Sequence, residues 1–278
     1  MTEHTNNQGQ RSDPCTNEEL FRAALIDTDE DTAWEAISIL HLQGGRDAFE
    51  RAHTLSTSGD AHERRVGADI LGQVGVPDDT FCEEAVVALL AMLEHEQEPE
   101  VLSSIAVALG HRRDPRAIEP LVRLKNHPDD RVRFGVVLGL TCHEDEQAIQ
   151  TLIELSADTD TDVRDWATFA LGSQIDSDTP AIHAALLARL ADEDDTTRGE
   201  AMVGLACRDD QRMVEPLLTD LEAGWWGSLL LEAAIAIGDP RLYPTLVRLR
   251  EEHKGEKDNW PFSMLEEAIE KCRPSLPS

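Results

Sequence analysis

The chain has 278 residues and a formal net charge of −30, and 41% of its residues are hydrophobic but only 4% are aromatic. This apolar fraction can bury a large core, and the scarcity of aromatics favours closely packed helices rich in Ala and Leu over a β-sandwich. The acidic balance disfavours binding to nucleic acid or to anionic membranes; it suits a basic protein partner, or serves solubility alone.

The start of the chain, 1–16, is polar and has no apolar segment, so we expect a disordered tail without a signal peptide. No run of 18 apolar residues occurs, which predicts the absence of a membrane span. The cysteines are widely spaced and form no Cys-x-x-Cys pair: Cys15, Cys82, Cys142, Cys207 and Cys272. This pattern is typical of reduced thiols, and we expect a cytoplasmic protein.

From residue 17 onwards the chain repeats a two-helix unit. The clearest copy covers 158–172, where an acidic turn precedes a helix with the pattern V-R-x-x-A-x-x-A-L-G. The ends of this second helix recur at His41, Gly72, Gly110, Thr141, Gly172, Ala206 and Gly238. A first helix ends on Leu 16 or 17 residues before each of these positions, at Leu25, Leu55, Leu93, Leu124, Leu155, Leu190 and Leu221. The constant offset predicts seven registered helix pairs and a degenerate eighth pair that ends irregularly over 261–272.

Helix ends in this pattern have a direct physical interpretation. Asp160 precedes Val163 and is expected to cap the start of the second helix. Gly172 and its equivalents are expected to end the helix in a left-handed cap, which requires no Cβ. One helix pair cannot bury its apolar face alone, so neighbouring copies are expected to stack. No segment shows the alternating pattern of a strand.

The repeat resembles the HEAT-repeat superfamily, and more narrowly the PBS-lyase HEAT-like repeats. The resemblance rests on the V-R step at Val132-Arg133 and Val163-Arg164 and on the matching Arg64 and Arg198, whereas Leu102 and Leu230 depart from it. It implies an all-α, right-handed α-α superhelix of about seven to eight hairpins, in a single domain over 17–272 with tails at 1–16 and 273–278.

A recurring Arg and a preceding acid carry a further implication of the resemblance. Arg64, Arg133, Arg164 and Arg198 follow Asp60, Asp129, Asp160 and Asp194. In the family such residues form a ladder of Arg–Asp contacts between adjacent repeats, so we expect a structural role for them in preference to ligand binding.

Motifs for chemistry are missing. The turns at 27–31 and 158–162 carry alternating carboxylates, as calcium loops do, but Thr32 and Val163 stand where such a loop needs Gly, so helix capping is the better interpretation. The ten histidines are scattered, and no zinc spacing, phosphate-binding loop or nucleophile motif occurs. We expect no catalytic residue, cofactor or metal.

Aromatic residues are few, so their positions are informative. Trp225 and Trp226 lie in a turn that is polar in every other copy, either as an interface anchor or as a cover over the last helices. Four apolar residues are expected on an outward ridge that lines the concave surface or packs on a neighbouring repeat: Phe134, Leu138, Phe169 and Met202. Together with Trp166, Trp225 and Trp226, these four residues form the predicted partner-binding set.

Three functions remain open. The first is a non-catalytic scaffold, adaptor or inhibitor that binds a protein, with a basic partner suiting the charge and a monomer favoured. The second is an enzyme or enzyme subunit of the lyase-like or glycosylase-like HEAT type, for which Trp166, Asp165 and Glu200 are the nearest candidates. The third is an assembly element that dimerises through Trp225 and Trp226. Nucleic acid is not expected, because acids interrupt the basic residues of 112–133.

Overall fold

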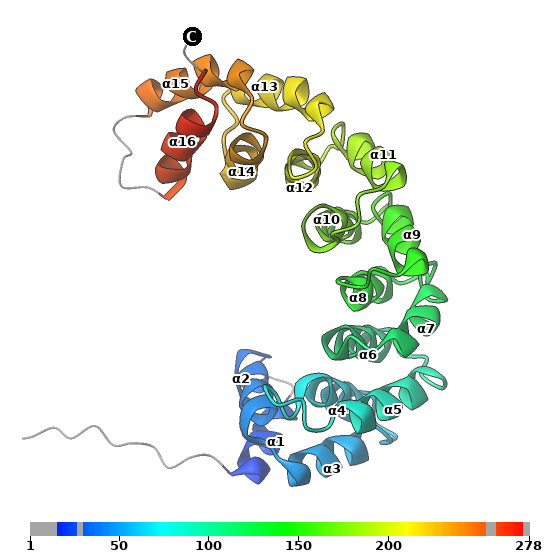
Figure 1. Cartoon of the computed structure of the whole chain (residues 1–278). Helices are drawn as coiled ribbons and strands as arrows, with labels where there is room; N and C mark the ends of the chain where they lie inside the picture. The colour runs from blue at the N-terminus through cyan, green and yellow to red at the C-terminus, as the bar shows by residue number, and fades with distance from the viewer. Residues whose placement is uncertain (1–15, 27–29, 254–259, 275–278) are drawn as a thin grey trace, which may run out of the picture. The chain divides into compact units, whose positions relative to one another are not determined.

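The computed structural model describes residues 16–26, 30–253 and 260–274, and in these ranges all regular structure is helical, as expected. First and second helices alternate along the chain (Figure 1). The α-helices are α1 (Asn17–Ala24), α2 (Glu30–Gln43), α3 (Arg46–Leu55), α4 (Ala61–Gln73), α5 (Cys82–Leu93), α6 (Pro99–Arg112), α7 (Ile118–Val122), α8 (Asp130–Leu140), α9 (Glu146–Leu155), α10 (Thr161–Phe169), α11 (Pro180–Arg189), α12 (Asp195–Ala206), α13 (Val214–Glu222), α14 (Ser228–Ile237), α15 (Tyr243–Glu252) and α16 (Trp260–Lys271).

Two compact units contain these helices, Met1–His95 and Glu96–Ser278, whereas the sequence predicts one repeat domain over 17–272. Helices α1 to α5 belong to the first unit and α6 to α16 to the second. Of the predicted tail 1–16, only Thr16 is described, and its side chain caps α1 by accepting a hydrogen bond from the Glu19 N–H. Of the predicted tail 273–278, residues 275–278 lie outside the described residues.

In the first unit, α1 packs on α2, α3 packs on α4, and α4 also contacts α2 and α5. Its core contains the fully buried side chains of Phe21, Leu40, Ile70 and Leu89. Arg46 ties α3 to α5, because its guanidinium donates to both carboxylate oxygens of Glu84 at 2.8 and 3.2 Å.

The second unit has two layers of helices. The second helices α6, α8, α10, α12, α14 and α16 pack side by side in chain order and form what we call the inner layer. The first helices α7, α9, α11, α13 and α15 form the outer layer (Figure 1). Between the layers lie buried side chains such as Leu121, Leu140, Leu152 and Leu171, so each pair completes its core only through its neighbours.

Glycines bring the inner helices unusually close together. A Cβ added at Gly110 would lie 2.8 Å from the Gly139 Cα, and one added at Gly204 would lie 2.5 Å from the Gly172 Cα. The prediction that Gly72, Gly110 and Gly172 form left-handed caps is therefore wrong, since each lies within a helical segment.

Only one of the predicted glycine caps has the expected geometry. Gly238 ends α14 with a φ of 58°, in the left-handed region. The predicted irregular end over 261–272 is also wrong, because α16 continues as a helix to Lys271.

Candidate protein-binding site

Aspartates cap the starts of α8, α10 and α12, as predicted for Asp160. The Asp129 side chain accepts from the Arg131 N–H at 3.0 Å, Asp160 accepts from the Val163 N–H at 3.0 Å, and Asp194 accepts from the Thr197 N–H at 2.8 Å. Each carboxylate satisfies a backbone donor that the helix leaves open and lies at the positive end of the helix dipole. The carboxylates of these turns therefore serve the fold.

The Arg–Asp ladder is present, and it joins consecutive repeats. Arg133 donates from Nε and Nη2 to the two oxygens of Asp158, each at 2.8 Å, and Arg164 donates in the same way to Asp192 at 2.9 and 3.1 Å. The acid partners are thus Asp158 and Asp192 of the following turn, and not the capping aspartates. The two acid side chains are 9% and 7% exposed, so the pairs are well shielded from water.

Burial and pairing act in opposite directions on these acids. Burial opposes ionisation of Asp158, but the hydrogen bonds from Arg133 and from the Asp160 N–H, with the charges of Arg133 and Arg164, outweigh it and lower its pKa. The pKa of Asp192 is lowered for the same reasons. Both rungs are therefore ionised at neutral pH and stabilise the stacking of repeats.

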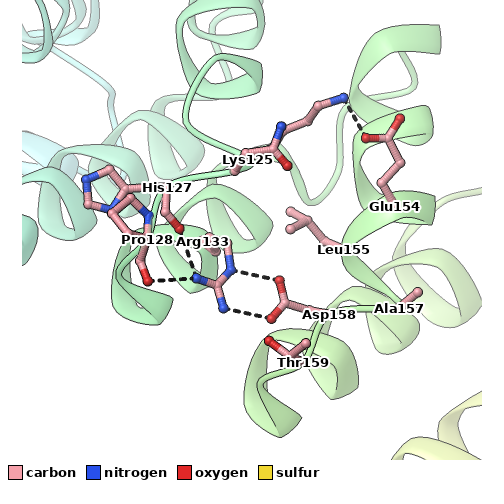
Figure 2. Close-up of a pocket in the computed structure, with 10 residues that line it drawn as sticks. Lys125, His127, Pro128, Arg133, Glu154, Leu155, Ala157, Asp158 and Thr159 are labelled. Atoms are coloured by element: carbon pink, nitrogen blue, oxygen red, sulfur yellow. Dashed lines mark hydrogen bonds and ion pairs between the residues drawn. The ribbon is translucent and has the colours of Figure 1, made fainter.

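A cavity of about 500 Å³ lies beside the first rung (Figure 2). Arg133 lines it, but its third nitrogen, Nη1, already donates to the carbonyls of His127 and Pro128 at 2.9 and 3.3 Å. Lys125 at the same cavity lies 2.5 Å from Glu154. Both cations that line this cavity are thus already paired. We therefore interpret the cavity as a gap between repeats and not as a ligand site.

Exposed aromatic rings lie on the inner layer. In α10 the face formed by Asp162, Trp166 and Phe169 points away from the buried side, and Trp166 is 42% exposed. Its ring contacts Phe134 of α8 edge-on at 5.9 Å and Phe169 at 5.6 Å between centroids. Phe134, Leu138 and Phe169 are each partly exposed. The structure thus brings four of the predicted partner-binding residues to adjacent helices of one layer.

Two partly exposed carboxylates, on α10 and α12, have raised pKa values. Burial raises the pKa of Glu200 in α12 to about 7, with a contribution from the charges of Asp165 and Glu232. Burial and the charges of Asp194 and Asp162 raise the pKa of Asp165 to about 6. Asp165 Oδ1 is buried without a hydrogen-bond partner among the described residues. We call Phe134, Trp166, Phe169, Asp165 and Glu200 the inner patch.

Met202 does not belong to this surface. Its side chain is 1% exposed, so the expectation that it lies on the outward ridge is wrong. The repeat that ends at Ala206 is longer than the preceding one, 34 residues against 31, so the residue equivalent to Phe169 is Val203. Val203 is itself 2% exposed, which means that the apolar ridge ends at α10.

The Trp225-Trp226 turn lies apart from the inner patch, between α13 and α14. Gly224 has a φ of 88°, which reverses the chain so that the Trp225 N–H donates to the Asp220 carbonyl at 3.1 Å. Trp225 is 59% exposed, whereas the Trp226 ring packs on His253 with centroids 4.6 Å apart. One tryptophan is thus accessible to a ligand and the other partly covers the end of α15.

A histidine cluster lies outside all the sequence predictions. His183 of α11 hydrogen-bonds through Nδ1 to Asp210 at 2.6 Å and through Nε2 to Asp178 at 2.5 Å, and Arg212 also donates to Asp210. Hydrogen bonds to Asp210 and Asp178 raise the pKa of His183. An Asp-x-Arg pattern recurs at the start of the first helices, as in Asp114-Pro-Arg116 and Asp239-Pro-Arg241. This pattern could have predicted the Asp210–Arg212 pair, but it gives no indication of His183.

Two other features are absent from the part of the chain that the structure describes. In that part of the chain no group of three or more His, Cys, Asp or Glu is placed to hold a metal ion. Likewise, none of its helices has the length and hydropathy needed to cross a membrane.

Comparison with known proteins identifies the repeat. Residues 86–172 match the family model of HEAT repeats. The chain is 28% identical over 237 residues to protein YibA of Escherichia coli K12, covering 83% of each sequence. It also matches the crystal structure of Escherichia coli YibA, with a TM-score of 0.73 and 25% identity over 94% of this chain and 93% of that one.

A second solved structure has the same fold at lower identity. It is the complex of CpcE and CpcF of phycocyanin lyase from Nostoc sp. PCC7120, with a TM-score of 0.50, 17% identity, and coverage of 98% of this chain and 100% of that one. The prediction of a HEAT-like, all-α repeat fold is confirmed.

Proposed function

We propose that this chain is a non-catalytic binding module that grips a protein partner through the inner patch. The observation that carries the proposal is the exposed Trp166, held edge-on between Phe134 and Phe169. Aromatic rings that are fixed by their neighbours lose little conformational freedom when a partner covers them, which favours them as binding residues. We also propose that the chain is monomeric and that it is located in the cytoplasm.

Charge favours a basic segment as the partner. Asp165 adjoins Trp166 in α10 and its charge acts on Glu200 in α12, so the proposal has a Lys or Arg side chain of the partner contact both carboxylates and the rings. Such a cation would lower the raised pKa values of the two acids, so binding would release protons. Affinity is therefore expected to rise as the pH increases from about 6 to 8.

The similarity to the CpcE–CpcF complex is compatible with this function, since that complex is an assembly of two protein chains. It supports no particular partner for this chain. A catalytic role for Asp165 and Glu200 is the alternative that the same acids leave open, and the proposal assigns them to the recognition of a cation.

The experiment is a capture assay from the source cells with the purified chain as bait, followed by affinity measurements on the captured protein. Trp166→Ala is expected to weaken binding roughly tenfold or more, the effect of removing an interface Trp. Trp34→Ala is the matched control, because Trp34 is 44% exposed but lies in the first unit. Equal binding by wild type and Trp166→Ala, or binding indifferent to salt, contradicts the proposal.

A further inference from the structure

Within the second unit, the Arg–Asp ladder changes at its third arginine, Arg198. Arg198 is anchored to its own turn in the same way as the two before it, since Nη1 donates to the carbonyls of Asp192 and Glu193 at 2.8 and 3.3 Å. Arg164 makes the equivalent bonds to the carbonyls of Asp158 and Asp160. The guanidinium of Arg198 is thus presented towards the next repeat as the ladder requires.

No carboxylate of the next turn takes up this guanidinium. Where Asp158 and Asp192 follow the ends of their first helices, the chain has the Gly224-Trp225-Trp226-Gly227 turn after α13. Arg198 Nε lies 3.7 Å from Asp220 Oδ2, beyond hydrogen-bond length, and Nη2 donates to Asp195 of its own helix at 2.6 Å. The Nε–Nη2 edge that binds one carboxylate in both preceding rungs is here split between two weaker contacts.

A cavity of about 290 Å³ opens at this edge. Its lining combines Arg198 and the two acids that contact it, Asp195 and Asp220, with the indoles of Trp225 and Trp226 and with Leu229 and Leu230. A volume of this size is at the lower end of ligand sites and accommodates one apolar group and its polar head, not an extended segment.

We propose that this cavity binds the C-terminal carboxylate of a partner polypeptide whose last side chain is apolar. The carboxylate accepts from Nε and Nη2 of Arg198 and completes the rung that the chain leaves open, and the apolar side chain lies against Trp225 and the two leucines. Two acids compete with the ligand: Asp195 is 57% exposed, so its pairing with Arg198 is screened by water, and Asp220 lies 3.7 Å from Nε, beyond hydrogen-bond length. This site is separate from the inner patch and does not depend on it.

The test is isothermal titration of the full chain with acetyl-Ala-Leu carrying a free carboxylate, with its C-terminal amide, and with phenylacetate. We expect the free acid to bind roughly tenfold more tightly than the amide, because only a carboxylate accepts both hydrogen bonds of the guanidinium edge. Phenylacetate is expected to bind more weakly than the peptide. Equal binding of acid and amide, no saturable binding of the acid, or tighter binding of phenylacetate overturns the proposal.

Variants locate the site. Arg198→Lys keeps the charge but loses the planar pair of donors, and Trp225→Ala removes an exposed ring, so each is expected to weaken binding of the free acid severalfold. Arg133→Lys alters an intact rung and is the matched control, with binding unchanged. Trp166→Ala also leaves this binding unchanged, which separates the result from that for the inner patch. Unaltered binding by Arg198→Lys refutes the assignment.

Discussion

At the scale of single residues, the raised pKa of Glu200 predicts that the free energy of unfolding depends on pH. Its pKa is raised from 4.5 to about 7, mainly by burial, so between these values the folded chain holds a proton that the unfolded chain has lost. The free energy of unfolding therefore falls as the pH rises through this interval. Glu200→Gln removes the effect, and at pH 8 we expect the variant to be about 1 kcal/mol more stable than wild type after allowance for solvent screening.

Urea unfolding at pH 4.5 and at pH 8 measures this difference. At pH 4.5 the gain is expected to shrink, because the folded protein then carries neutral Glu200. Glu267→Gln removes the same charge from an exposed site of α16 and is the control. A gain for Glu200→Gln that is the same at both pH values contradicts the burial argument.

His183 predicts a slope of the same sign, because its folded-state pKa is also raised. Both of its ring nitrogens face carboxylates, so the imidazolium form is favoured and its pKa is raised above 6.5. The stabilisation is fully present below pH 6.5 and is lost as the pH rises through the folded-state pKa. We expect His183→Gln to lower the free energy of unfolding by about 1 kcal/mol at pH 5.5 and by less at pH 9.

Groups around His183 provide the check on this prediction. Asp178, Asp210, Arg208 and Arg212 are the charged neighbours of the ring or of its partners. Asp178→Asn removes one of the two acceptors and is expected to reduce the same pH dependence. If neither variant alters the dependence of unfolding on pH from 5.5 to 9, the cluster does not contribute to stability.

Residue positions were predictable only where the repeat kept its length. Leu138 and Phe169 lie one repeat of 31 residues apart on adjacent helices, and the sequence predicts that both, with Phe134, belong to the exposed ridge. The expected exposure of Met202 was wrong, and Val203 at the position equivalent to Phe169 is also buried, so this position has no exposed side chain in α12. His183 pairs with residues from two different loops, and no local pattern encodes that meeting.

At the scale of helices, the close packing of the inner layer predicts that the stability of the fold depends strongly on its glycines. Ala at position 110 would place a Cβ 2.7 Å from the Leu138 carbonyl oxygen and 2.8 Å from the Gly139 Cα, and neither backbone atom can move without shifting α8. We expect Gly110→Ala to destabilise the fold by about 1–3 kcal/mol, although Ala is the better helix former.

Thermal unfolding of two variants tests this. Gly59→Ala is the control, because nothing lies within 4 Å of a Cβ built at Gly59 and its backbone is not strained. Its melting temperature is expected to stay near that of wild type or to rise slightly. A melting temperature of Gly110→Ala equal to that of the control shows that the helices tolerate a wider spacing.

Helices themselves were predictable from the sequence, and the role of their glycines was not. The Leu-to-Gly offset located both helices of each pair because burial between two layers requires it. A glycine near a helix end, however, has the same sequence appearance whether it caps the helix or touches a neighbour. Gly238 and Gly110 differ only in what packs against them, which depends on the adjacent repeat.

At the scale of the whole molecule, a net charge of −30 predicts sensitivity to salt. Like charges repel more strongly in the compact chain than in the unfolded one, and salt screens this repulsion. We expect the melting temperature to rise by roughly 3 °C or more between 20 mM and 500 mM NaCl, a rise of about 1 kcal/mol in stability.

Potassium chloride at equal ionic strength is the control, since screening does not depend on the cation. A melting temperature that falls with salt means that the Arg–Asp rungs outweigh the general repulsion. Binding of a basic partner is expected to depend on salt in the opposite way. The affinity for the partner should fall as the salt concentration rises over the same range.

The ladder also determines how such a chain can grow by duplication. Each rung takes its arginine from one repeat and its acid from the next, so a repeat with both halves can be copied in place without loss. A second copy of 142–172 inserted after Gly172 would pair Arg164 with the new Asp158 and the new Arg164 with Asp192. The 207–238 repeat has a tryptophan turn in place of the acid and Leu230 in place of the arginine, so a copy of it would add no rung. Length is therefore free to vary in the middle of the array, and the Trp225-Trp226 repeat marks where such growth stops.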